Sequence, residues 1–243
     1  MTDFIQVVAA NLQNGSARAR GPVEGGTTSP AQCTAAPPCT VPLRERASIN
    51  PMNISRTALE GIPDVVILVD EQRVKRDSDY PSAKAGDALA AGRLADRFID
   101  ARAIDRVKLL IGDAAPILLP VHALEMSGVN EIPVALSVRL ASELDLEVEA
   151  SIVQTNTAGH TGASGYQRLA NPALFSGEVR PGAAYLIVDD FIGQGGTVAN
   201  LRGHVVANAG HVLGVATLTG RPYSAKLAPD SSLIKAVRQK HGN

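Results

Sequence analysis

The sequence predicts an α/β domain with a mostly parallel sheet covered by helices. Compact apolar runs at residues 65–69, 117–121 and 184–188 are typical of buried strands. Helical periodicity separates these runs, as at residues 132–144, and alternating strands and helices indicate βαβ units. Hydrophobic residues make up 45% of the chain but aromatics only 3%. The core must therefore be mostly Ala, Val, Leu and Ile, which suits helices packed on a buried sheet.

The first half of the domain is expected to begin with the strand at residues 65–69. Residues 71–82 are charged and contain a proline, so we expect a loop. A helix is expected over residues 83–103, because small and apolar residues recur at spacings of three and four: Ala88, Ala91, Ala95 and Phe98. Residues 107–111 are expected to form a short strand.

The middle of the chain continues the alternation. After the strand at 117–121 we expect a loop at 122–129 and then a helix, with Asn130 as its N-cap and Pro133 in its first turn. One face of that helix carries a set of apolar residues: Ile132, Leu136, Leu140 and Leu144. Residues 146–153 are expected to be a strand and 154–172 a polar loop.

The last part of the sheet is expected to contain two more strands. They are residues 184–188 and 212–218, with a helix at about 198–209 between them that stops at Gly210. Right-handed crossovers would make these strands parallel. Ligands of such sheets bind beyond the carboxyl ends of the strands.

Residues 14–42 are rich in Gly, Pro, Ser, Thr and Ala, which predicts a flexible N-terminal segment at residues 1–47, in which residues 1–12 could form a short helix or strand. We place the domain at residues 48–243. Cys33 and Cys39 lie in the flexible segment, and no His or further Cys is near enough to complete a zinc site. We interpret them as two free thiols.

Charge and hydropathy disfavour some classes of partner. The formal net charge is -1 and the pI is about 6.5, so no global field attracts nucleic acid, which is disfavoured as a partner without being excluded. The N-terminus lacks the basic start of a signal peptide, and no apolar run approaches the length of a membrane span. We expect a cytoplasmic protein with no membrane partner.

The segment from Asp189 to Thr197 carries the chemistry. Two carboxylates, Asp189 and Asp190, follow a buried strand, and a loop with Gly193, Gln194, Gly195 and Gly196 leads into a helix at Thr197. Glycines let backbone N–H groups approach an anion, and a helix N-terminus adds partial positive charge. The acids would repel a phosphate but can accept hydrogen bonds from vicinal hydroxyls. The pattern indicates a ribose 5-phosphate site.

This segment resembles the phosphoribosyl-pyrophosphate motif of type I phosphoribosyltransferases. The match is unbroken at the apolar run, both acids, Gly195 and Thr197, whereas Gly193 and Gln194 depart from the usual loop residues. The resemblance implies a three-layer fold, two acids on the ribose 2′ and 3′ hydroxyls, and a loop on the 5′-phosphate. It also implies Mg²⁺, held indirectly by the two acids through the hydroxyls or water.

The likeness extends to other segments, over about residues 105–220. The stretch Leu119 to His122 resembles the pyrophosphate loop of ComF-like members, which implies pyrophosphate contacts from Val121 and His122. The segment from Arg168 to Asn171 resembles the ComF-like Arg-x-x-Asn segment, and Arg168 could pair with the pyrophosphate because Arg matches phosphate geometry. Tyr223 follows the last strand, where family members place base-contacting residues. No Lys occurs between Lys108 and Lys226, so the mobile-loop lysine of some relatives is absent.

The activity implied is that of a pentosyltransferase. It would transfer ribose 5-phosphate from phosphoribosyl pyrophosphate to a nitrogen nucleophile such as a nucleobase and release pyrophosphate. Two alternatives stay open: a non-catalytic sensor of phosphoribosyl pyrophosphate or nucleotides, and a ComF-like accessory protein of DNA uptake or processing. The family also allows a homodimer.

Overall fold

The computed structural model describes residues 56–125, 128–156 and 171–242. Its centre is a sheet of four parallel strands in the order β1-β8-β7-β2. These strands are β1 (Val66–Ile67), β8 (His211–Gly220), β7 (Ala184–Ile192) and β2 (Ile117–Pro120). The predicted α/β class with a parallel sheet is confirmed.

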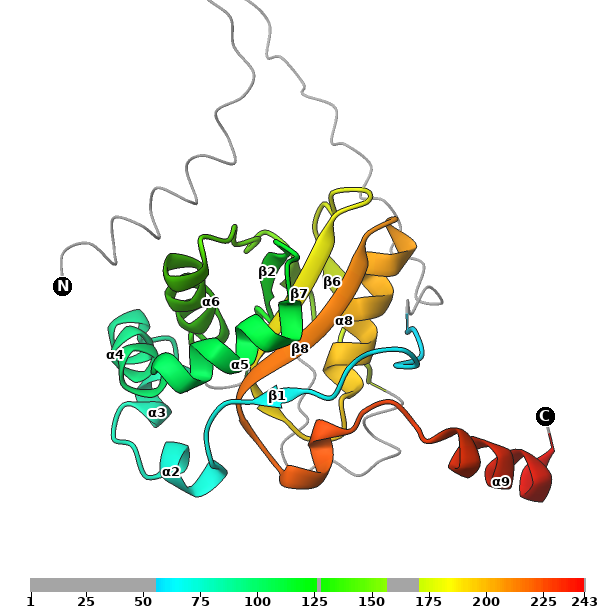
Figure 1. The fold of residues 1–243 in the computed structure, drawn as a ribbon. Helices are drawn as coiled ribbons and strands as arrows, with labels where there is room; N and C mark the ends of the chain where they lie inside the picture. The colour runs from blue at the N-terminus through cyan, green and yellow to red at the C-terminus, as the bar shows by residue number, and fades with distance from the viewer. Residues whose placement is uncertain (1–55, 126–127, 157–170, 243) are drawn as a thin grey trace, which may run out of the picture. The chain divides into compact units, whose positions relative to one another are not determined.

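Helices cover both faces of this sheet. Figure 1 shows α4 (Ala88–Phe98), α5 (Ala101–Ile111) and α6 (Ile132–Leu144) on one side, and α8 (Gly196–Ala207) on the other. The side chains between α8 and the sheet form an apolar core that includes Ile187 and Leu201. Strands buried on both faces explain why the runs were apolar without alternation.

The expected helix at residues 83–103 is wrong in extent, because the chain divides it into α4 and α5. Asp87 and Asp100 each cap a new helix: the Asp87 carboxylate accepts from the amides of Leu89 and Ala90, both at 3.0 Å, and Asp100 accepts from that of Ala103 at 2.9 Å. Such capping favours a fresh helix start over a continuous helix.

The expected strand at 107–111 is also wrong, since these residues form the end of α5. Ala103, Ile104 and Val107 are buried at helical spacing, and a short apolar run does not distinguish strand from helix. The expected loop at 71–82 instead contains α2 (Glu71–Lys75) and the start of α3 (Tyr80–Lys84).

Two short antiparallel strand pairs form in addition to the central sheet. They are β3 (Leu124–Glu125) with β4 (Gly128–Val129), and β5 (Val153–Gln154) with β6 (Phe175–Ser176). Of the expected strand at 146–153, only Val153 lies in a strand, β5, and two isolated parallel bridges join Val148 to Leu118 and Val153 to His122. The N-cap of α6 is Glu131, although the Asn130 side chain still accepts from the Ile132 amide at 3.2 Å.

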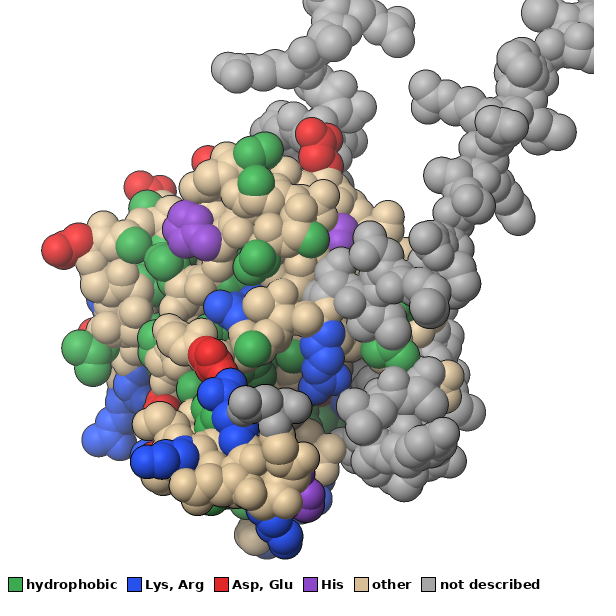
Figure 2. Space-filling view, turned by 90° about the vertical axis from the view of Figure 1, so that its right-hand side faces the viewer, with side chains coloured by type: hydrophobic (Ala, Val, Ile, Leu, Met, Phe, Trp, Pro, Cys, Tyr) green, Lys and Arg blue, Asp and Glu red, His purple; other side chains and the backbone are tan. Residues whose placement is uncertain are grey.

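The chain ends in the 3₁₀ turn η1 (Pro222–Ala225) and helix α9 (Ser231–His241), which has no buried residue. Figure 2 views the side on which α9 lies in Figure 1, and Lys and Arg gather in the lower half of that face. Among the described residues, none of the helices has both the length and the apolarity to cross a bilayer.

Candidate functional site

The two predicted acids lie inside β7 rather than after it. The strand runs four residues further than expected, to Ile192, and pairs with β8 up to Gly220. Asp189 and Asp190 are therefore almost fully buried, with 7% and 5% of their surfaces exposed. They lie near the carboxyl ends of the parallel strands, which is the edge where such sheets bind ligands.

Burial governs the protonation of Asp189. Burial raises the pKa of the Asp189 carboxyl well above its ordinary range, and the neighbouring negative charge of Asp190 raises it further. The Asp189 Oδ1 atom accepts a hydrogen bond from the Asp190 amide at 2.8 Å, which partly offsets this rise. Asp189 is thus a carboxyl that a hydroxyl-bearing or cationic ligand would help to ionise.

Lys84 is a site residue that the sequence did not indicate. Its Nζ lies 3.1 Å from Asp190 Oδ2. The contact is an ion pair rather than an aligned hydrogen bond, since this oxygen has no hydrogen-bond partner among the described residues. Lys84 is 106 positions before Asp190, so no local pattern links the two. Only the packing of α3 near the end of β7 brings them together.

The backbone around α3 holds Lys84 in place. The Glu131 amide donates to the Ala83 carbonyl at 3.2 Å. Gly128 has φ +133°, and a Cβ at this position would lie 2.5 Å from the Ala85 carbonyl oxygen. Gly128 therefore permits a close backbone approach between the β3–β4 pair and the end of α3.

The glycine loop leads from β7 into α8, as predicted. Gly195 is the N-cap residue with φ +70°, and its carbonyl accepts the first helical bond, from the Ala199 amide at 2.9 Å. The amides of Gly196, Thr197 and Val198 precede that bond and have no acceptor within the helix. A Cβ at Gly196 would meet no atom within 4 Å. The loop thus offers N–H donors at a helix N-terminus next to open space, which suits a phosphate.

The segment after β2 meets the predictions only in part. The Val121 amide donates to the Val188 carbonyl at 2.8 Å, so it continues the sheet and is not a free donor for pyrophosphate. The His122 carbonyl accepts from the Gln154 amide at 2.9 Å. The His122 Nδ1 atom is buried and has no hydrogen-bond partner among the described residues. Arg168 lies outside the described residues.

Tyr223 lies in η1, directly after β8, and is 70% exposed. Its hydroxyl accepts from Arg221 Nη1 at 3.0 Å. The Arg221 amide donates to the Ile192 carbonyl at 3.4 Å, which ties η1 to the end of β7. The proposed base-contacting residue is thus on the same edge of the sheet as the acids.

Asp189 and Asp190 could hold a magnesium ion only together with oxygen atoms from a substrate or water. No group of three or more His, Cys, Asp or Glu side chains in the described ranges could enclose a metal ion. Two carboxylates are hard oxygen donors of the kind that Mg²⁺ prefers, and Mg²⁺ commonly keeps waters and substrate oxygens as its other ligands. The pair therefore suits an ion that arrives with its substrate.

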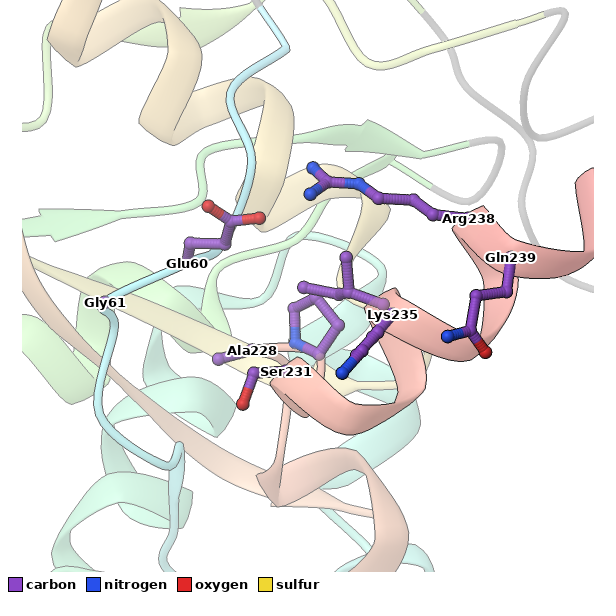
Figure 3. A pocket seen from close by; sticks show the side chains of 9 residues that line it. Glu60, Gly61, Ala228, Ser231, Lys235, Arg238 and Gln239 are labelled. Atoms are coloured by element: carbon purple, nitrogen blue, oxygen red, sulfur yellow. The ribbon is translucent and has the colours of Figure 1, made fainter. Parts of the chain in front are cut away.

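A hollow of about 800 Å³ lies elsewhere, between α9 and the turn at Glu60 and Gly61. Figure 3 shows Glu60, Lys235 and Arg238 around it. It includes neither acid and no residue of the glycine loop. We place the candidate site at the edge of the sheet, because the acids, the open loop and Lys84 meet there.

Comparison with known proteins finds two sequence relatives. Protein TraN of Escherichia coli is 40% identical over 180 residues, which are 74% of this chain but 40% of TraN. An uncharacterized protein of Haemophilus influenzae is 39% identical over 127 residues, 52% of this chain and 28% of that protein. The chain thus spans less than half the length of these relatives. No protein-family model matches the chain.

Solved structures with a similar arrangement include two from Leishmania donovani. Adenine phosphoribosyltransferase has a TM-score of 0.35 at 11% identity, covering 75% of this chain and 80% of that one. UMP synthase has a TM-score of 0.34 at 14% identity, covering 70% and 45%. Because these scores and identities are low, the function proposed below rests on the site residues themselves.

Proposed function

We propose that this protein binds phosphoribosyl pyrophosphate with magnesium and transfers its ribose 5-phosphate group to a nitrogen nucleophile, releasing pyrophosphate. The observation that carries the proposal is one continuous segment, Asp189 to Thr197. It presents two buried carboxylates and a helix N-terminus open to solvent at the same edge of a parallel sheet. A sugar phosphate offers a matching diol and phosphate.

Each group in the segment has a distinct role. The carboxylates of Asp189 and Asp190 accept hydrogen bonds from the two ribose hydroxyls, which fixes the sugar ring. The amides of Gly196 and Thr197 donate to the 5′-phosphate, where the partial positive charge of the α8 N-terminus favours an anion. The Thr197 hydroxyl adds a further donor.

The chemistry is a substitution at C1 of the ribose. The lone pair of the acceptor nitrogen forms a bond to C1, the bond from C1 to the pyrophosphate oxygen breaks, and pyrophosphate leaves with that electron pair. The proton of the acceptor nitrogen passes to solvent. Magnesium, when bound, offsets the charge of the departing pyrophosphate. The protein contributes mainly by holding the sugar in a reactive orientation and by stabilising charge.

A second candidate function is that of a non-catalytic sensor of the same ligand. The observation in its favour is the ion pair between Lys84 and Asp190, which occupies one of the two carboxylates. An enzyme must release this carboxylate from Lys84 in every catalytic cycle, whereas a sensor releases it only when it binds its ligand. The sensor would bind the sugar phosphate and release no pyrophosphate.

One experiment separates these functions. Calorimetry would measure binding of phosphoribosyl pyrophosphate with and without Mg²⁺, and a coupled assay would follow pyrophosphate release with a panel of nucleobases. We expect magnesium-dependent binding that is lost in Asp190→Asn and weakened in Thr197→Val. Asp105→Asn, at an exposed position on α5, is the matched control. Binding without release would favour the sensor, and no binding by the wild-type protein would exclude both.

A further inference from the structure

The ion pair between Lys84 and Asp190 joins two distant parts of the chain at the candidate site. Lys84 ends α3 in the first half of the domain, whereas Asp190 lies near the end of β7. Their charged atoms are 3.1 Å apart. The side chain of Lys84 is 27% exposed and that of Asp190 only 7%. The lysine thus lies at the boundary between solvent and the buried acids.

The burial of the Asp190 carboxylate is energetically unfavourable, which indicates a role in binding for this ion pair. A buried carboxylate is unfavourable unless a cation compensates its charge. A surface ion pair would add little stability by itself, yet here the acid is deeply buried and the amine is partly in solvent. The amine of Lys84 thus has solvent on one side, while its backbone is held by the hydrogen bonds of Ala83 and Ala85. Tyr80, one turn earlier, has its ring 5.9 Å from the same Nζ.

We propose, on the basis of the function proposed above, that Lys84 is a pyrophosphate-binding residue that holds Asp190 until the substrate arrives. In phosphoribosyl pyrophosphate the leaving oxygen and the 2′ hydroxyl are on adjacent carbons. A cation that touches a carboxylate gripping this diol is therefore close to the leaving group. When a ribose hydroxyl donates a hydrogen bond to Asp190, the side chain of Lys84 leaves this carboxylate and its amine contacts the pyrophosphate. Lys84 thus supplies a cation from α3.

The test compares two ligands that differ only in the pyrophosphate. Isothermal titration would measure the affinities of phosphoribosyl pyrophosphate and of ribose 5-phosphate, both with Mg²⁺, for the wild type and Lys84→Met. We expect the variant to lose about tenfold in affinity for phosphoribosyl pyrophosphate, the size of one charge-assisted hydrogen bond, and about none for ribose 5-phosphate. Lys84→Arg should restore most of the loss. Lys108→Met, at an exposed site on α5, should have no effect.

A structural role gives a different result. If Lys84 only keeps the site folded, Lys84→Met weakens both ligands equally, and the proposal is overturned. Equal affinities in variant and wild type overturn it as well. Circular dichroism and thermal melts would monitor folding. If Lys84→Met unfolds, Lys84→Gln takes its place with the same expected result, because glutamine keeps a hydrogen-bond donor for the buried Asp190 carboxylate but carries no charge. If the wild type binds neither ligand, the proposed function fails first, and Lys84 is then only a structural cation.

Discussion

Gly195 is the position where a single methyl group should do most damage to the glycine loop. Its φ is +70°, in the left-handed region, and a Cβ would lie 2.8 Å and 3.1 Å from the two Cδ atoms of Leu227. A residue with a Cβ costs about 1–2 kcal/mol in this conformation. Displacing the flexible end of Leu227 should cost about 1 kcal/mol more.

We therefore expect Gly195→Ala to lower the free energy of unfolding by about 2–3 kcal/mol. In a chain of this size the melting temperature should fall by about 4–12 °C. Urea denaturation followed by circular dichroism measures the free energy directly. The same variant should bind the sugar phosphate less tightly, because the N-cap geometry of α8 changes with the loop.

Gly196→Ala is the matched control, one residue along. A Cβ there meets no atom within 4 Å, and the residue is the first of α8. Alanine should raise the helix stability by up to about 1 kcal/mol, while its methyl group occupies the space through which a phosphate approaches. Stability and affinity should thus change in opposite directions. If Gly195→Ala proves as stable as Gly196→Ala, the reasoning from backbone conformation is refuted.

Three further perturbations test other parts of the fold. Hydrogen bonds from Arg93, and then from Arg97, lower the pKa of Asp79 from 3.8 to about 2. The ionised Asp79 therefore stabilises the folded protein at neutral pH, and this contribution is lost as pH falls from about 4 to about 2. Asp79→Asn should flatten the acid-unfolding curve in that pH range. The raised pKa of Asp189 has the opposite sign, because the folded protein holds this proton more tightly than the unfolded chain and stability falls as pH rises above the unfolded pKa. Asp189→Asn should accordingly be more stable than the wild type at pH 7 in thermal melts, while losing the ligand; a less stable variant would contradict the assignment. Leu136 is fully buried on α6, and Leu136→Ala should cost about 2–5 kcal/mol in urea denaturation.

The sequence alone predicted the parallel sheet and the order of strand, glycine loop and helix in the segment from Asp189 to Thr197, although it placed the two acids after the strand rather than inside it. Both depend on local patterns: an apolar run long enough to be buried on two faces, and acids, glycines and a helix start in a fixed order. The helix over residues 132–144 was also predicted from the sequence, because its apolar residues recur on one face along its 13 residues. The Mg²⁺, the acceptor and the roles of the site residues stay predictions.

The tertiary structure decided what local patterns leave open. Residues 107–111 fit a strand by pattern, but they continue α5, which buries Ala103, Ile104 and Val107 at helical spacing. The Val121 amide is used by the Val188 carbonyl because the pairing of β2 with β7 continues one residue past Pro120. Lys84 reaches Asp190 through the packing of α3 against the β3–β4 pair. The two residues are 106 positions apart, so the sequence around each of them contains no pattern that predicts this contact. Periodicity encodes which residues are buried, but the folded chain determines which distant charges meet.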